Sequence, residues 1–173
     1  TRFRPLGFIS PSDVTVRSRN GVCAGASTVS NPAIRLENRS LDIFLRVSTI
    51  GSSFDRTIIA RSSFEVKKLG GIVRLIGDVI VPSVFPWECV EDPRVDPFYD
   101  DVVFHVRSFY HSVYNATLTF IADISDGTRV MPLTFLDSGD TFLLRDCRDS
   151  FPMSKDLIVL RPYFRDLHTG GIF

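Results

Sequence analysis

Four arginines near the start of the chain form the first group of residues that could bind a ligand. Arg2 and Arg4 are spaced by two, and so are Arg17 and Arg19, with Phe3 interleaved in the first pair. In an extended chain this spacing places both members of a pair on one side. Arginine is also the preferred cation for bidentate contact with phosphate. The pattern predicts an RNA-facing arm that uses these four arginines, and ordinary surface charge is the equally favoured alternative.

An acidic stretch near the middle of the chain forms the second group. Residues 88–101 carry a net charge of −5, whereas residues 1–40 carry +4 and the whole chain is neutral. Asp96, Asp100 and Asp101 lie in a connection that four prolines punctuate. Hard cations such as Ca²⁺ take carboxylate and carbonyl oxygens from such loops. A calcium site at these three residues is one prediction; a solvated acidic loop and a contact for a neighbouring subunit's arginines are the alternatives.

The third group is Asp137-Ser138-Gly139, which follows an apolar run. This triplet resembles the active-site loop of aspartic proteases, which need two such aspartates sharing one proton. That family prefers a small residue after the triplet, whereas Asp140 stands here. Asp, Ser and Gly are also the residues that a tight turn favours. We therefore expect a hairpin turn, and we expect no enzyme, because the histidines lack a nucleophile motif beside them.

Composition indicates which elements must position these residues. Among 20 cationic residues 17 are Arg, 16 of the 20 acidic residues are Asp, and Gln is absent, while Phe occurs 15 times. The scarcity of long helix formers favours strands and turns. A length of 173 residues suits one domain with its own core. Apolar runs stay well short of the ~20 residues of a membrane-spanning helix.

Residues 101–125 form the stretch around which we expect the chain to be organised. They predict two long strands joined near residues 110–113, because β-branched and aromatic residues alternate with polar ones. The second strand has an unbroken apolar row from Tyr114 to Ile124. We expect one dry face in this pair, with His105 beside Arg107 on the solvent side.

The remaining pattern predicts nine or ten strands in one domain. Residues 1–40 are assigned to an N-terminal arm with the first strand, and residues 41–173 to the β core. Residues 41–48 and 72–81 are clear strands, and residues 21–32 read as a loop. Ser62 and Glu65 have the spacing of a capping box before Gly70, which predicts one short helix. The fold class is all-β, an antiparallel sandwich or barrel.

An N-terminal arm, eight or more strands, one short helix and long proline-rich connections resemble the jelly-roll coat proteins of small icosahedral positive-strand RNA viruses. The picorna-like and plant types have an apolar-aromatic strand leading into a long one, as residues 104–110 lead into 114–124 here. The chain departs from the family after Ile124, where only about three more strands fit. The strand order therefore does not map onto the usual register.

This resemblance implies a structural subunit of the virion capsid. It implies self-assembly with other capsid subunits, genomic RNA held by the arginines of the arm, no membrane partner, and no cofactor other than Ca²⁺ at subunit contacts through Asp96, Asp100 and Asp101. Two alternatives stay open. One is a β-sandwich recognition domain, such as a viral spike or a secreted binding module, that does not assemble; the other is an aspartic-type hydrolase using Asp137.

Overall fold

Strands form nearly all the regular structure of the protein. The computed structural model describes residues 7–50, 56–66, 71–72, 74–111, 115–125, 129–137, 140–143, 147–162 and 171–172. Within these ranges, the helical element η1 is a single 3-10 turn at Pro11–Asp13. The predicted all-β sandwich is confirmed.

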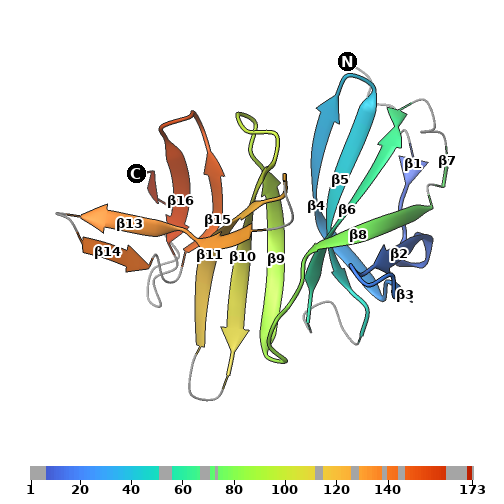
Figure 1. The fold of residues 1–173 in the computed structure, drawn as a ribbon, viewed down its shortest axis with the longest axis horizontal. Helices are drawn as coiled ribbons and strands as arrows, with labels where there is room; N and C mark the ends of the chain where they lie inside the picture. Colours follow the sequence, from blue (N-terminus) through green and yellow to red (C-terminus); the bar gives the residue numbers. More distant parts are fainter. Residues whose placement is uncertain are drawn as a thin grey trace.

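The first half of the chain builds a six-stranded sheet with the order β3-β2-β8-β6-β5-β4 (Figure 1). Its strands are β2 (Val14–Arg17), β3 (Cys23–Gly25), β4 (Thr28–Glu37), β5 (Ser40–Ser48), β6 (Ile58–Glu65) and β8 (Leu75–Val81). Neighbouring strands are antiparallel except β2 and β8, which run parallel. A short parallel pair, β1 (Gly7–Phe8) with β7 (Gly71–Ile72), accompanies this sheet.

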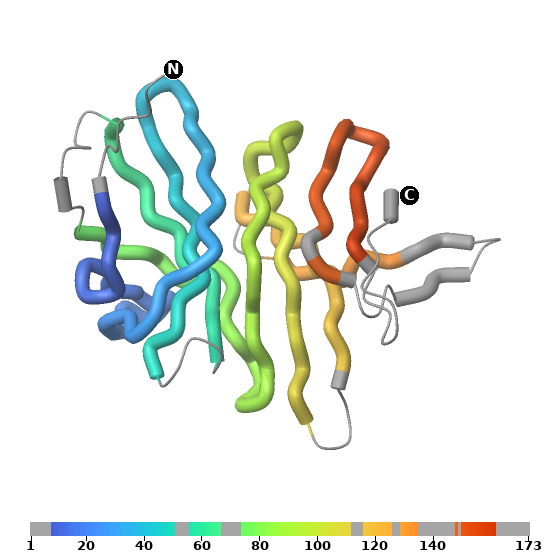
Figure 2. The backbone as a smooth tube through the Cα atoms, turned by 180° about the vertical axis from the view of Figure 1, so that it is seen from behind, coloured from blue at the N-terminus to red at the C-terminus, as the bar shows by residue number. Residues whose placement is uncertain are grey.

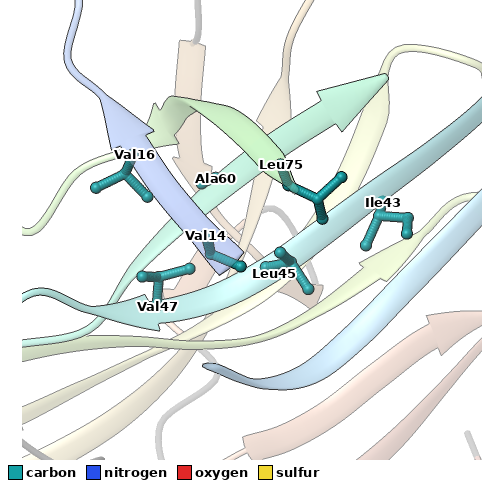
Figure 3. Close-up of a cluster of buried hydrophobic side chains, with 7 residues drawn as sticks. All are labelled: Val14, Val16, Ile43, Leu45, Val47, Ala60 and Leu75. Atoms are coloured by element: carbon teal, nitrogen blue, oxygen red, sulfur yellow. The ribbon is translucent and has the colours of Figure 1, made fainter. Parts of the chain in front are cut away.

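This sheet closes on itself at the junction between β3 and β4. The backbone NH of Ala26 donates to the carbonyl of Val14 on β2 at 2.9 Å, and the NH of Ser27 donates to Ser48 on β5 at 2.8 Å. β3 and β4 are the two margins of this sheet, so the two residues between them carry the chain from one margin to the other while pairing with β2 and then with β5, and the sheet curves into a small barrel. Its interior is the apolar cluster of Figure 3: Val14, Val16, Ile43, Leu45, Val47, Ala60 and Leu75.

A second sheet packs on the outside of this barrel. It has the order β12-β11-β10-β9, from β9 (Glu88–Val95), β10 (Val102–Tyr110), β11 (Asn115–Asp123) and β12 (Arg129–Pro132). A second apolar cluster fills the interface, with Phe44, Ile59 and Val81 from the barrel and Val90, Val103 and Ala122 from the four-stranded sheet. These two layers make the sandwich.

The last strands cover the other face of the four-stranded sheet. β15 (Cys147–Pro152), β16 (Ile158–Pro162) and β17 (Gly171–Ile172) form a three-stranded sheet, and β15 lies beside β10 and β11 (Figure 2). The hydroxyls of Thr119 and Ser150 are 3.0 Å apart across this contact. β13 (Thr134–Asp137) and β14 (Asp140–Leu143) form a separate hairpin.

The predicted central strand pair is confirmed, but its single dry face is wrong. β10 and β11 are antiparallel with Val102 opposite Asp123 and Tyr110 opposite Asn115. Side chains on both faces of β10 are buried, and His105 and Arg107 are only 1% and 7% exposed. The cause is a layer that the sequence did not predict: the barrel covers one face of the sheet and β15 covers part of the other.

Other boundaries also differ from the expectations. Ser62 and Glu65 lie on β6, paired with β5, so the predicted helix is wrong at these positions, because cross-strand pairing overrides a local capping pattern. Residues 21–32 contain β3 and the start of β4 instead of one loop. The acidic connection contains strand β9, whose bulge at Asp92 (φ +49°) precedes Pro93.

Strand connectivity bears on two further expectations. Residues 14–40, which we had assigned to the arm and first strand, contribute β2, β3 and β4 to the barrel.

The jelly-roll connectivity is not confirmed. Strands β2 to β8 build the six-stranded sheet and β9 to β12 build the next, whereas the two Greek keys of a jelly roll carry the chain back and forth between sheets.

Candidate functional site

Exposed aromatic side chains gather where β8 leads into β9, beside the end of β10. We call Val84, Phe85, Trp87 and Tyr110 the aromatic platform; their exposed fractions are 65%, 46%, 40% and 52%. The rings of Phe85 and Trp87 stack with centroids 5.5 Å apart and an interplanar angle of 9°. The backbone NH of Tyr110 donates to the carbonyl of Trp87 at 2.8 Å, which fastens the two segments together.

A buried carboxylate holds the loop that carries this platform. One oxygen of Glu88 accepts hydrogen bonds from the backbone NH groups of Val84 at 2.6 Å and Phe85 at 3.2 Å. The hydroxyl of Ser83 donates to the carbonyls of Phe85 and Glu88, each at 3.1 Å. Because these bonds fix the backbone before any partner arrives, the aromatic residues are presented in an organised form.

The other oxygen of Glu88 pairs with the guanidinium of Arg107, and neither side chain is more than 8% exposed. Arg107 also donates from Nε to Nε2 of His105 at 3.3 Å and lies 5.2 Å from the centre of the Phe120 ring. A buried charge is tolerated only when it is paired and hydrogen-bonded in this way. The arrangement therefore connects the platform loop rigidly to the middle of the four-stranded sheet.

His105 is the most strongly perturbed titratable group that is described. Burial lowers the pKa of its imidazole to about 3, and the neighbouring charge of Arg107 lowers it in the same direction. The ring is neutral near pH 7 and accepts the hydrogen bond from Arg107. Since it is 1% exposed, it contributes to the interior of the sheet and not to a surface site.

Arg17 and Arg19, two of the predicted RNA ligands, lie together at a second place, on β2 and just after it. Arg17 forms a two-point ion pair with Asp78 on β8, with Nε to Oδ1 at 2.7 Å and Nη2 to Oδ2 at 3.0 Å. These hydrogen bonds raise the pKa of Arg17 and lower that of Asp78. Both arginines line an open pocket of about 240 Å³ with Gly21 and Val79. Arg19 makes no ion pair with any residue that the structure describes.

Arg2 and Arg4 lie outside the described residues, so the structure does not bring the four predicted arginines together. The charge of Arg17 is already matched by Asp78, which leaves Arg19 as the more available cation of the described pair. The prediction of RNA contact by Arg2, Arg4, Arg17 and Arg19 stays a prediction.

The predicted calcium ligands lie at the opposite end of the four-stranded sheet from the aromatic platform (Figure 1). Asp96 is buried, and its carboxylate accepts from the backbone NH groups of Phe98 at 2.7 Å and Tyr99 at 3.3 Å, which shapes the turn. Asp100 and Asp101 are exposed. Among the described residues, no group of three His, Cys, Asp or Glu side chains is arranged to hold a metal ion. The calcium site therefore stays a prediction.

Asp137 occupies the end of a strand, as the hairpin interpretation expects. It pairs with Asp140 across β13 and β14, and residues 138–139 of the turn lie outside the described part. The hairpin is confirmed. Trp87 and Glu88 were not among the predicted site residues. Their one signal in the sequence is the chain's only Trp, which stands between Pro86 and a glutamate in a segment that we interpreted as loop.

We compared the chain with protein families, curated proteins and solved structures. No family model, no curated protein and no solved structure matches this chain. No helix within the described ranges has the length and apolar character needed to cross a membrane.

Proposed function

We propose that this protein is a coat subunit, a structural β-sandwich that assembles with copies of itself into a virion shell around an RNA genome. The observation that carries the proposal is the aromatic platform: a Trp, a Tyr and a Phe held in a fixed arrangement and left open to solvent. Trp and Tyr are the residues most enriched at the energetic centres of protein–protein interfaces. A loop that is ordered in advance loses little entropy on association.

The wider surface supports the same proposal. Large apolar side chains are also exposed at the β9–β10 turn, where they are Phe98 and Tyr99, and on β15 and the turn that follows it, where they are Phe151, Met153 and Leu157. Exposed apolar groups of this kind, gathered at strand ends, are typical of surfaces that bind other proteins. A shell subunit needs several such contacts, because each copy meets neighbours around more than one symmetry axis.

The basic residues give the proposal its RNA component. Arg19 lines the pocket beside Arg17, and Arg2 and Arg4 precede it in the chain. Contacts to phosphate supply sequence-independent affinity that weakens as salt rises. Ca²⁺ bound between acidic side chains of neighbouring subunits remains part of the proposal through Asp96, Asp100 and Asp101.

The direct test is to image and size the purified protein. Static light scattering and negative-stain electron microscopy are recorded at low and high salt, with and without single-stranded RNA and with CaCl₂ or EDTA. A coat subunit gives closed particles of uniform diameter, and RNA promotes their formation at low salt. A monodisperse monomer under every one of these conditions contradicts the proposal.

One observation favours a second candidate, a recognition module that does not assemble. The stacked, nearly parallel Phe85 and Trp87 rings also offer an apolar ring face on which a foreign ligand could stack. The two candidates differ in a simple way: the recognition module stays monomeric, and its Trp87 fluorescence changes only when the foreign ligand is added. Self-assembly changes that fluorescence with protein concentration alone.

A further inference from the structure

We infer that the aromatic platform of one copy binds the opposite end of the four-stranded sheet in a second copy of this chain. That opposite end, which we call the acidic end, consists of Phe98, Tyr99, Asp100 and Asp101. The inference rests on the proposed function, because it names the contact through which the subunit assembles.

The acidic end is constructed much like the platform. In both places a buried carboxylate accepts two successive backbone NH groups and so fixes a turn that exposes aromatic residues. Asp96 does this for Phe98 and Tyr99, which are 38% and 50% exposed. The carbonyl of Asp101 accepts from the NH of Ile124 at 2.8 Å, which anchors the turn to the end of β11.

The charges of the two ends are opposite. Asp100 and Asp101 are exposed at the acidic end. At the platform, exposed Arg56 donates from Nε to the carbonyl of Pro86 at 3.1 Å, so its guanidinium is held at the backbone between Phe85 and Trp87. His111 lies against Trp87 with ring centroids 4.9 Å apart. Bringing the ends together places carboxylates near a guanidinium, with aromatic contacts between them.

Contact between two identical platforms is less favourable on the same grounds. A twofold arrangement would bring Arg56 of one copy toward Arg56 of the other, and like charges opposed across an interface reduce affinity. The same argument applies to two acidic ends, where four carboxylates would meet. The charges therefore favour one platform with one acidic end.

The two ends are separated by the length of β10, whose nine residues span about 30 Å in extended conformation. A copy bound at its platform thus keeps its acidic end open for another copy. Such a head-to-tail contact is heterologous, and it closes into a ring when the rotation between copies permits. Rings about symmetry axes are the units from which a shell is made.

The test is a charge exchange between the two ends, followed by sedimentation velocity and electron microscopy. Arg56→Asp alone, or Asp100→Arg with Asp101→Arg, is expected to weaken assembly by about tenfold or more, because close opposite charges become like charges. Combining all three substitutions exchanges the signs of the charges at the two ends, so the ends attract each other again and assembly returns toward the wild-type level. Glu37→Arg, at an exposed acid on β4 that belongs to neither end, is the matched control and leaves assembly unchanged.

The outcomes separate this contact from the function on which it rests. If the wild type forms particles and the single-ended reversals form them equally well, the contact is overturned while the coat proposal stands. Loss of assembly without rescue in the triple variant also overturns it, provided that circular dichroism shows each variant folded. If the wild type remains monomeric at every concentration, both proposals fall, and a change in Trp87 fluorescence on adding a foreign ligand would then identify a different occupant.

Discussion

The barrel and the four-stranded sheet are both closed from solvent, but they are closed by different chemistry. The fully buried side chains of the described barrel interior are aliphatic, from Val14 to Leu75, and Phe64 packs against them while partly buried. The four-stranded sheet buries the Glu88–Arg107 pair, His105, and hydroxyl groups that include Thr119. A dry cluster with Val90 and Val103 separates these two regions. Outside its apolar interior the six-stranded sheet also buries Asp42, which pairs with Arg35 and Arg61. The contrast therefore lies between the apolar interior of the barrel and the buried ion pair and imidazole within the four-stranded sheet.

The difference indicates which layer requires one defined geometry of its buried side chains. Apolar burial tolerates many arrangements of similar volume, whereas a buried ion pair is favourable in one geometry only. The carboxylate that makes this ion pair is also the group that fixes the aromatic platform. We therefore regard the barrel as the stable support and the four-stranded sheet as the layer that positions the contact surface.

The largest expected effect comes from removing the buried carboxylate. Glu88→Ala leaves Arg107 buried without its partner and frees the NH groups of Val84 and Phe85, so we expect a loss of about 3–5 kcal/mol in the free energy of unfolding. Denaturant unfolding followed by Trp87 fluorescence measures it. Glu37→Ala, at an exposed acid on β4, is the control and should change little. Equal stability of the two variants would show that the ion pair does not hold the loop.

A truncation in the barrel gives the contrasting case. Leu45→Ala should cost about 3 kcal/mol, because it leaves a cavity in a core of aliphatic side chains. Unlike Glu88→Ala, it should leave the native Trp87 emission spectrum unchanged, since the platform lies on the other layer. A Leu45→Ala variant whose native spectrum shifts as much as that of Glu88→Ala would remove the distinction between the two regions.

Strands were predicted correctly where apolar and polar residues alternate strongly. The exposure of their side chains was predicted wrongly where another sheet covers the face expected to meet solvent. Strand β10 was predicted because Val, Phe and Tyr alternate with polar residues, but the same alternation placed His105 and Arg107 in solvent. Phe44 belongs to a different cluster from its neighbours Ile43 and Leu45, and it is 0% exposed because the four-stranded sheet covers it. The alternation of residues along a segment identifies it as a strand, but it does not tell whether one or both of its faces are covered by other sheets.

The site was harder to predict than the fold for a related reason. Glu88 lies in a proline-rich acidic stretch, where the sequence pattern favours solvent-exposed carboxylates. What distinguishes Glu88 is its buried ion pair with Arg107, nineteen residues later in the chain. The Ser62–Glu65 capping pattern failed similarly, because pairing with β5 decides that segment. Long-range pairing of this kind has no local signature.

The polar layer should also respond to acid. The pKa of His105 is about 3 in the folded protein and near 6.5 when unfolded, so between these values the unfolded state binds the extra proton. Stability is therefore complete above pH 6.5 and falls on acidification, by about 2 kcal/mol between pH 6.5 and 5. In His105→Gln this part of the slope disappears, as urea titrations across that range would show. A wild-type slope identical to that of the variant would contradict a buried neutral imidazole.

The smallest expected effect concerns close packing in the barrel wall. A Cβ at Gly77 would lie 3.1 Å from Cβ of Ala60, so Gly77→Ala should cost about 1 kcal/mol. Gly25→Ala is the matched control, because nothing lies within 4 Å of its added methyl group. Thermal unfolding of both variants measures the difference. A Gly77→Ala variant at least as stable as Gly25→Ala would show that the barrel accommodates the added group freely.

Site-specific photocrosslinking can detect whether copies of this protein meet platform to acidic end. A benzoylphenylalanine replaces Phe85, and the assembled protein is irradiated, digested and analysed by mass spectrometry. Mixing isotopically labelled and unlabelled protein distinguishes crosslinks between copies from those within one. We expect crosslinks from position 85 of one copy to residues 97–101 of another. Efficient crosslinks from position 85 to position 85, or to another surface, would contradict it.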